Sequence, residues 1–343
     1  MNDVDVGKLQ RARQQRPSER RDQRGGTAQR GDKGQKADKP HQIPKRGWRE
    51  ILGRVGERIS RDNISIIAAG AAFYAFLAIP SVLVALVTLY GLVSDPNQIG
   101  QQVSSLQGVI PGDISNMLTK QLSSLASKPH STLGIGLVVA VLVALWGARS
   151  GMSTVITALN VAYGEQEERG FIRFQAAALL LTAGAVVFMV VAIALIAVLP
   201  AVIGFLPLGG LGKTIAAWVR WPILLAFVMA GLALLYRYAP CRAEPRWRWV
   251  SWGAVVATVL WIVGSALFSI YVGQFAAYNK TYGATAAIVV LLMWLYLSMF
   301  AILLGAELNA EMEHQTARDT TTGKPRPMGD RGARVADTVA DPT

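Results

Sequence analysis

Three long stretches without a single charged side chain are the strongest constraint on how this chain can fold. They cover residues 63–94, 174–212 and 249–279, and they are 32, 39 and 31 residues long. A helix needs only about 20 apolar residues to cross a hydrocarbon core about 30 Å thick. The overall balance agrees, since 52% of the chain is apolar and only 16% is charged. The chain is therefore predicted to be an integral membrane protein.

The spans are predicted to be helices rather than strands. The apolar runs far exceed the roughly ten residues of a barrel strand, and nothing in them alternates with a period of two. The fold class is thus an all-α polytopic membrane protein, a bundle of six transmembrane helices within a membrane domain of residues 48–314. The expected spans are about residues 64–92, 132–161, 174–206, 215–238, 250–275 and 284–306.

The positions of the cations predict the orientation. Of the 34 Lys and Arg residues, 17 lie in residues 1–62, two in 169–173, four in 237–248 and five after residue 307. Only six lie elsewhere. Cytoplasmic segments are enriched in Lys and Arg, so the N and C termini are both predicted to be cytoplasmic. A signal peptide is not expected, because the first 48 residues are polar.

Both ends of the chain, residues 1–47 and 315–343, are predicted to be disordered cytoplasmic tails. The N-terminal tail is basic and has hardly an aliphatic side chain, so it cannot form a core. Its expected partner is anionic lipid at the membrane surface. Nucleic acid is the alternative, but no aromatic residue precedes Trp48 and no nucleic-acid-binding fold is recognisable.

Two amphipathic segments are expected outside the spans. In WREILGRVGERISRDN, residues 48–63, the apolar side chains fall on one helical face, which predicts an interfacial helix lying flat before the first span. In the external loop between the first two spans, Ile114, Leu118, Leu122 and Leu125 recur at helical spacing. That spacing predicts a short helical pair, acting either as packing or as a lid over a substrate.

The stretch ALWGARSGMSTVITALNVAYG places Arg149 among apolar residues of the second span. A charge inside a bilayer costs from about 2.5 to well over 10 kcal/mol, so it usually has a partner. Helical rise puts Arg149 and Glu307 at depths that differ by about 9 Å. We hypothesise an intramembrane polar network in which Arg149 pairs with Glu307, joined by Asn160 and Asn309. Alternatively, Arg149 extends toward the inner headgroups while Glu307 lies in water.

Prolines and glycines mark possible hinges and contacts. Pro80 in the first span and Pro222 in the fourth are candidate hinges, because proline removes a helical hydrogen bond. Gly147 and Gly151 form a G-x-x-x-G pattern, which predicts close packing of the second span on another helix.

Nothing in the sequence predicts catalysis. The histidines His41, His130 and His314 are widely separated, and Cys241 is the single cysteine, so no metal-ligand pattern is present. No P-loop and no Gly-x-Ser-x-Gly motif occurs. No catalytic, cofactor-binding or metal-binding residues are therefore predicted, and the chain is not expected to be an enzyme.

Five blocks of sequence resemble the YihY/BrkB family, also described as virulence factor BrkB and formerly as ribonuclease BN-like. They are AAGAAFYAFLAIPSVLVALVTLYGL, ALWGARSGMSTVITALNVAYGEQEERGF, LYRYAP, YNKTYG and WLYLSMFAILLGAELNAE. The resemblance covers roughly residues 48–314. Pro80 and Arg149 each stand one position earlier than in many members, and Ala286 replaces a common glycine.

The resemblance implies a multi-pass protein of the bacterial plasma (inner) membrane with six spans. The family is largely without an established biochemical function. Its members are associated with serum resistance and with export of lipid or lipopolysaccharide. The ribonuclease label is generally regarded as a misassignment.

We therefore predict a transporter or flippase-like protein for a lipid-like or anionic amphipathic substrate in the cell envelope. The alternative is a noncatalytic membrane scaffold or assembly factor whose basic tail recruits a partner. Ribonuclease activity is not expected, and a homo-oligomer is compatible with the sequence.

Overall fold

The structure, a computed structural model, describes residues 33–93, 130–205, 210–274 and 279–340, and most of these residues are helical. A single bridge between Pro245 and Thr321 is the one piece of β structure among them. The elements are the 3₁₀ turn η1 (Pro40–Gln42) and the helices α3 (Lys45–Arg61), α4 (Ile64–Val93), α7 (His130–Tyr163), α8 (Phe171–Phe205), α9 (Gly210–Tyr238), α10 (Trp247–Gln274), α11 (Asn279–His314) and α12 (Arg334–Asp337).

The predicted fold class is confirmed. Six of these helices, α4 and α7 to α11, are long and apolar enough to cross a membrane. Each expected span coincides closely with one of them, although α11 continues about two turns past residue 306, to His314. That extension places three carboxylates, Glu307, Glu311 and Glu313, on one rigid helix.

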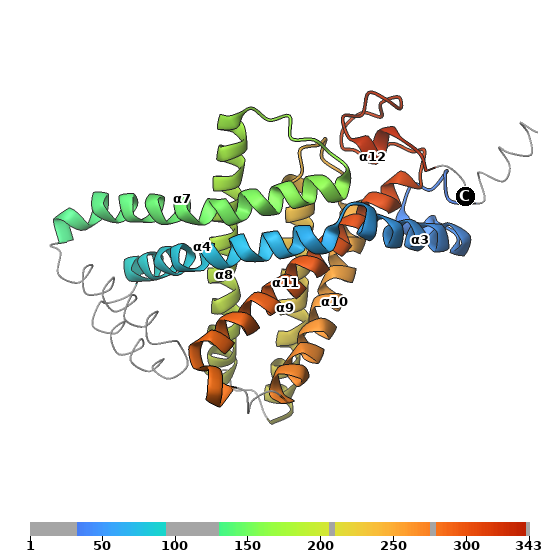
Figure 1. Cartoon of the computed structure of the whole chain (residues 1–343). Helices are drawn as coiled ribbons and strands as arrows, with labels where there is room; N and C mark the ends of the chain where they lie inside the picture. Colours follow the sequence, from blue (N-terminus) through green and yellow to red (C-terminus); the bar gives the residue numbers. More distant parts are fainter. Residues whose placement is uncertain (1–32, 94–129, 206–209, 275–278, 341–343) are drawn as a thin grey trace, which may run out of the picture.

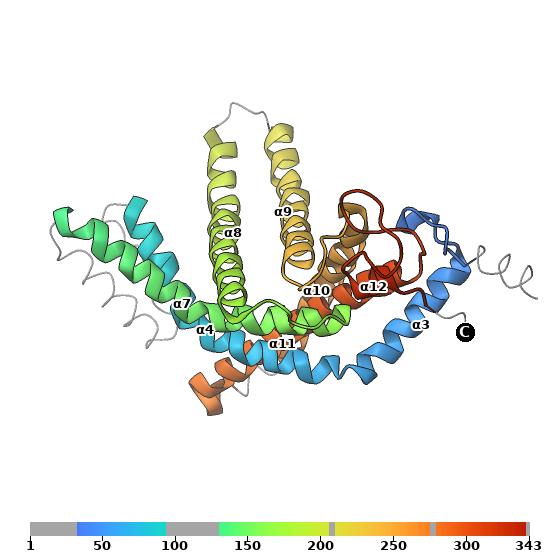
Figure 2. The ribbon, with the colours of Figure 1, turned by 90° about the horizontal axis from the view of Figure 1, so that it is seen from above.

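The six long helices form three hairpins that converge at one end and diverge at the other (Figures 1 and 2). The hairpins are α4 with α7, α8 with α9, and α10 with α11. At the converging end lie α3, α12, the connections 164–170 and 239–246, and the C-terminal segment 315–340. We call this end the hub. The helices alternate in direction, so both ends of the described chain lie at the hub.

The hydrophobic core also lies at the hub rather than along the whole length of the helices. The largest cluster of buried apolar side chains is drawn from the hub-side ends of all six helices and includes Ile64, Ala68, Ile156, Leu159, Tyr163, Ala178, Tyr236, Val250, Ala257, Leu303 and Ala306. Farther along, large apolar side chains such as Ile193 and Leu267 are exposed. Exposed apolar surface on spanning helices is the surface that lipid covers.

Two helix crossings depend on glycine. A Cβ on Gly151 would lie 3.1 Å from the Ala78 Cβ, so α7 packs closely on α4, as the G-x-x-x-G spacing predicts. The crossing of α10 and α11 is tighter. A Cβ on Gly253 would lie 2.2 Å from the carbonyl oxygen of Gly305, so no larger residue fits there without moving a helix.

The helix α3 differs from its expected role as a helix lying on lipid. Its apolar face, including the buried Ile51 and Val55, packs on Trp249, Leu308 and Met312 of α10 and α11. Protein therefore covers much of this face, because the extended end of α11 offers an apolar partner beside it, while Leu52 stays 59% exposed. The chain then turns into α4 at Asn63, which has a φ of 51°. Asparagine tolerates this left-handed conformation better than most residues.

The C-terminal segment also differs from expectation, because residues 316–340 fold against the hub instead of forming a loose tail. The buried guanidinium of Arg331 donates to four main-chain carbonyls, those of Ala317, Arg318, Arg326 and Ala336. A segment with few apolar residues thus folds around an arginine, an arrangement that a count of aliphatic residues does not reveal.

Part of the expected N-terminal tail is folded as well. The main-chain N–H of Ala317 donates to Gln35, and the hydroxyl of Thr316 donates to Ala37. Residues 1–32 and the expected helical pair between the first two spans lie outside the described residues. Pro80 and Pro222 both lie inside continuous helices, α4 and α9, and their role as hinges stays a prediction.

Candidate functional site

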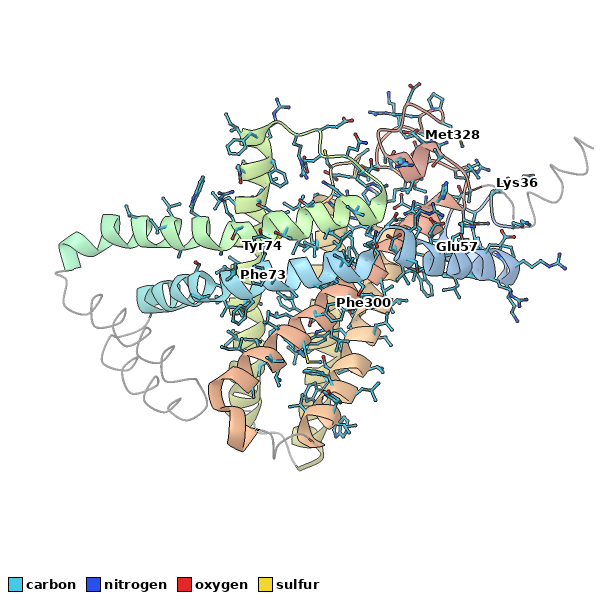
Figure 3. The ribbon with its side chains drawn as sticks, in the orientation of Figure 1. Lys36, Glu57, Phe73, Tyr74, Phe300 and Met328 are labelled. Atoms are coloured by element: carbon cyan, nitrogen blue, oxygen red, sulfur yellow. The ribbon has the colours of Figure 1, made fainter. Side chains whose placement is uncertain are left out.

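The charged side chains of the described chain gather at the hub. Figure 3 shows nitrogen and oxygen atoms crowded around α3, the end of α11 and the C-terminal segment, while the diverging helices carry mostly carbon. Two buried groups of ion pairs organise this end of the molecule. The first joins α3 to α11, and the second joins the α9–α10 connection to α11.

The first group pairs two arginines with two glutamates. Arg58 donates from Nε to Glu311 Oε1 at 2.8 Å and from Nη1 to Glu307 Oε2 at 3.2 Å. Arg54 donates from Nε to Glu311 Oε2 at 2.5 Å. Both arginine side chains are about 85% buried and Glu307 is fully buried. Buried charges need partners, and here each charge has one.

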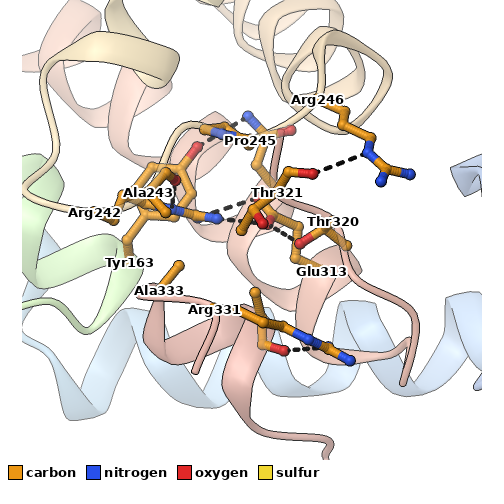
Figure 4. Close-up of polar contacts among 12 residues, drawn as sticks. Tyr163, Arg242, Ala243, Pro245, Arg246, Glu313, Thr320, Thr321, Arg331 and Ala333 are labelled. Carbon is orange, nitrogen blue, oxygen red and sulfur yellow. Dashed lines mark hydrogen bonds and ion pairs between the residues drawn. The ribbon is translucent and has the colours of Figure 1, made fainter. Parts of the chain in front are cut away.

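The second group centres on Arg242 and Glu313, both without solvent exposure (Figure 4). Their two hydrogen bonds are parallel, at 2.6 Å from Nη2 and 3.1 Å from Nη1. Thr320 donates to the same carboxylate at 2.7 Å, and the Arg242 guanidinium lies 5.0 Å from the centre of the Tyr163 ring. Burial alone would lower the pKa of Arg242, but the charge of Glu313 raises it, so the guanidinium stays charged.

Asn309 ties α11 to α10 and α7. Its Oδ1 accepts the main-chain N–H of Gly253 at 2.8 Å, and its Nδ2 donates to Tyr163 Oη and to the Val250 carbonyl at 3.3 Å each. The side chain is fully buried. Asn309 therefore fixes the close crossing of α10 and α11 rather than facing a ligand.

Asn160 has a similar role at the α7–α8 connection. Its Oδ1 accepts the N–H of Cys241 at 2.7 Å, and its Nδ2 donates to Glu167 Oε2 at 2.9 Å. Burial would raise the pKa of Glu167, but hydrogen bonds from Arg169 and Asn160 lower it. The pair thus joins the α7–α8 connection to the α9–α10 connection.

Arg149 lies apart from both groups. Its Nη1 donates to Gln175 Oε1 on α8, and its guanidinium lies 4.2 Å from the ring centre of Trp146, while its buried Nε has no hydrogen-bond partner among the described residues. Glu307 pairs with Arg58 instead. The structure therefore does not form the hypothesised Arg149–Glu307 pair, because α7 crosses α8 near Arg149 and takes it away from the end of α11.

Two clefts flank α3 at the hub. The larger, about 480 Å³, lies between α3, the end of α11 and the C-terminal segment, and is lined by Arg54, Glu57, Arg58, Arg61, Glu311, His314, Arg334, Val335, Thr338, Val339 and Ala340. The smaller, about 360 Å³, lies against the N-terminal part of α3 and is lined by Lys33, Arg46, Arg49, Glu50, Gly53, Arg54 and Glu57. Both contain more cations than carboxylates.

The comparisons with known proteins agree with this architecture. The family profile described as "Virulence factor BrkB" matches residues 55–329, well over half of the chain. This chain belongs to the BrkB family. The matched range includes all six long helices and every residue of the two buried ion-pair groups except Arg54.

Relatives of this BrkB-family chain include proteins named as membrane proteins and one with a ribonuclease-like name. A protein of Bacillus subtilis whose name describes it as ribonuclease-like, YfkH, is 37% identical over 198 residues, which cover 55% of this chain and 71% of that protein. A UPF0761 membrane protein of Methylibium petroleiphilum is 29% identical over 272 residues, 77% of this chain and 62% of the relative. Another UPF0761 membrane protein, from Idiomarina loihiensis, is 38% identical over 101 residues, 29% of this chain and 34% of the relative. No solved structure matches the chain.

Sequence reasoning missed most of the ion-pairing residues of this BrkB-family protein. Arg54 and Arg58 are four residues apart, and so are Glu307 and Glu311, so each pair faces one side of its helix. The matching spacing of the two pairs was the sequence feature that could have predicted ion pairs between these helices. Arg242 and Glu313 had no such signal, because the contact depends on how a connection folds back on α11. Within the described residues, no group of three or more His, Cys, Asp or Glu side chains could hold a metal ion.

Proposed function

We propose that this BrkB-family membrane protein binds an anionic, lipid-like molecule and moves it across the membrane. The observation that carries this proposal is the position of Arg149. Its guanidinium has an amide and an indole as neighbours, and no carboxylate among the described residues forms an ion pair with it. In the two ion-pair groups at the hub, by comparison, every arginine is paired with a carboxylate.

The surroundings of Arg149 suit the headgroup of an amphipathic molecule. Gln175 lies four residues after the start of α8, or about 6 Å along that helix, so the guanidinium lies near the hub-side end of α8. Trp146 is 57% exposed on the same side. A partly buried arginine beside an exposed indole pairs favourably with a phosphate or carboxylate, while the apolar helix surface receives acyl chains.

Reconstituted protein tests the proposal directly. Liposomes with fluorescent phosphatidylglycerol or fluorescent phosphatidylcholine in the inner leaflet are compared with and without the purified chain. We expect the protein to accelerate the appearance of the anionic lipid in the outer leaflet. No acceleration over protein-free liposomes for either lipid would contradict transport.

We further propose that the hub faces the cytoplasm, where Lys- and Arg-rich segments are retained. A cysteine introduced at the exposed Lys324, in a chain with Cys241→Ala, should react with a membrane-impermeant maleimide in inverted vesicles and stay unlabelled in intact cells. The reverse labelling would contradict this orientation. On the same basis, residues 1–32 would contact anionic lipid of the inner leaflet.

A scaffold remains the second candidate, and one observation favours it. The C-terminal segment bonds to the α7–α8 connection through Glu165 and Arg334, and to the α9–α10 connection through Ala243 and Gly332. The hub is therefore an ordered surface, formed by several connected segments, that a cytoplasmic protein could recognise. If no lipid moves in liposomes while deletion of residues 1–32 abolishes a captured partner, the scaffold is favoured over the transporter.

A further inference from the structure

The larger cleft beside α3 is a second cationic feature, separate from Arg149. One wall is the last two turns of α3, the second is the end of α11, and the third is the C-terminal segment from Arg334 to Ala340. Its volume of about 480 Å³ falls within the range of small-molecule sites. Arg61, which lines the cleft, lies two residues before Asn63, where the chain turns into the first spanning helix.

The charges around the cleft do not balance. Four arginines line it, against the carboxylates of Glu57 and Glu311. Among the side chains that line the cleft, positive charges therefore exceed negative charges by two, and His314 also lines the cleft. A cleft with an excess of one sign of charge concentrates ions of the other sign.

Two of the four arginines are available to a ligand. Arg54 and Arg58 are held by the buried glutamates. Arg61 forms only an exposed contact of 3.9 Å with Glu57, and such surface pairs contribute little. Arg334 donates from Nη1 to the carbonyl of Gly164 at 3.1 Å and forms no ion pair among the described residues, although the carboxylate of Glu165, which accepts its main-chain N–H, also attracts its charge.

We propose that this cleft binds a phosphate group. The planar guanidinium groups of Arg61 and Arg334 match phosphate oxygens, and a phosphate, with a charge of about −1.5 to −2 at pH 7, offsets the excess positive charge of the lining side chains. The apolar side chains of Val335, Val339 and Ala340 form the remaining wall. A phosphate with an attached glycerol or acyl portion would therefore contact apolar surface as well.

The phosphate group in the cleft can belong to either of two ligands, the headgroup of an anionic lipid or free phosphate. Because the third wall belongs to the C-terminal segment, either ligand also holds residues 334–340 in place. This binding does not depend on transport, so its test is a binding measurement and stands whether or not the protein moves lipid.

The experiment uses the full-length chain in phosphatidylcholine nanodiscs. Inorganic phosphate is titrated by calorimetry, and in a second arm the nanodiscs contain phosphatidic acid, detected by native mass spectrometry. We expect binding in at least one arm, together with slower amide hydrogen exchange in residues 334–340. Binding of inorganic phosphate assigns the site to free phosphate, and retention of phosphatidic acid alone assigns it to a lipid headgroup.

The variant Arg61→Gln with Arg334→Gln removes both available cations. We expect binding at least about tenfold weaker, since a hydrogen bond to a charged group contributes enough for such a change. The matched control is Arg318→Gln with Lys324→Gln, which removes the same charge from exposed positions outside the cleft and should leave affinity within about twofold.

Three results would overturn the phosphate site. They are no binding of either probe by the unmodified chain, unchanged binding by the double variant, and an equal loss in the control. Should the double variant fail to fold, as judged by its melting temperature, Arg61→Gln alone provides the test, because Arg61 is exposed and makes only the weak contact with Glu57.

Discussion

Arg242 and Glu313 form a doubly hydrogen-bonded ion pair from which solvent is fully excluded, with Nη2 to Oε2 at 2.6 Å and Nη1 to Oε1 at 3.1 Å. The pair joins the connection between α9 and α10 to the last turn of α11. Two of the three hairpins are therefore locked together at the hub. The buried group of Arg58, Glu307 and Glu311 does the same for α3 and α11.

Breaking the Arg242–Glu313 pair should destabilise the protein strongly. Arg242→Met leaves the Glu313 carboxylate buried and unpaired, which costs about 3–5 kcal/mol in comparable cases. The double variant Arg242→Met with Glu313→Leu should lose much less than the sum of the single variants. Chemical denaturation in detergent, arranged as a double-mutant cycle, measures this difference, and additive losses would show that the two side chains act independently.

Arg58 and Arg61 give a matched comparison on one helix. Arg58→Gln removes the arginine donor to Glu307 and one of the two arginine donors to Glu311, and we expect a loss of about 3 kcal/mol in the free energy of unfolding. Arg61→Gln removes an equal charge from an exposed side chain and should change that free energy by less than about 0.5 kcal/mol. Equal effects of the two substitutions on unfolding would rule out a structural role for the buried group.

The crossing of α10 and α11 should not tolerate a methyl group. Gly253→Ala places a Cβ 2.2 Å from the Gly305 carbonyl oxygen, so the helices must separate, and we expect a loss of at least about 2 kcal/mol or a failure to fold. Gly184→Ala on α8 is the control, because nothing lies within 4 Å of its Cβ position. Alanine there should be neutral or stabilising by up to about 1 kcal/mol. Thermal unfolding of both variants checks the contrast.

Acid should loosen part of the C-terminal segment. Burial would raise the pKa of Asp319, but hydrogen bonds from Thr321 and from the N–H of Arg326 lower it below the usual aspartate value. A lowered pKa in the folded state adds stability above the unfolded value of about 3.9, and that stability is lost as the pH falls further.

Hydrogen exchange in residues 319–326 reports this effect. After correction for intrinsic exchange rates, protection should fall as the pH drops below about 4. In Asp319→Asn, protection should be lower at neutral pH and nearly independent of pH. A pH response in that variant equal to the original one would assign the effect to another group.

The fold was largely predictable from the sequence. Charge-free runs of 31 residues or more are typical of membrane spans, and only helices and closed barrels can span a membrane. Packing at Gly151 followed from the spacing of small residues. The partner of Arg149 was not predictable. Helical rise gives the depth of a residue along its own helix, but it does not show which other helix crosses at that point. In the structure α7 crosses α8 near Arg149, and Gln175 becomes its neighbour.

The folded ends of the chain were missed for a different reason. Composition estimates whether a segment can form an apolar core, but residues 316–340 fold around the buried guanidinium of Arg331. The face of α3 was correctly identified as apolar, yet the sequence could not distinguish lipid from the protein surface formed by Trp249 and Met312. Both cases depend on contacts between segments far apart in the chain.

The most direct measurement of the proposed function is the rate at which proteoliposomes move fluorescent phosphatidylglycerol, compared among the unmodified chain, Arg149→Lys and Arg149→Gln. We expect Arg149→Gln to reduce the protein-dependent rate by at least about tenfold, since a charge-assisted hydrogen bond is lost, while Arg149→Lys keeps part of it. Phosphatidylcholine should move equally slowly with all three proteins. An unchanged phosphatidylglycerol rate in folded Arg149→Gln would contradict a role for Arg149 in moving an anionic lipid.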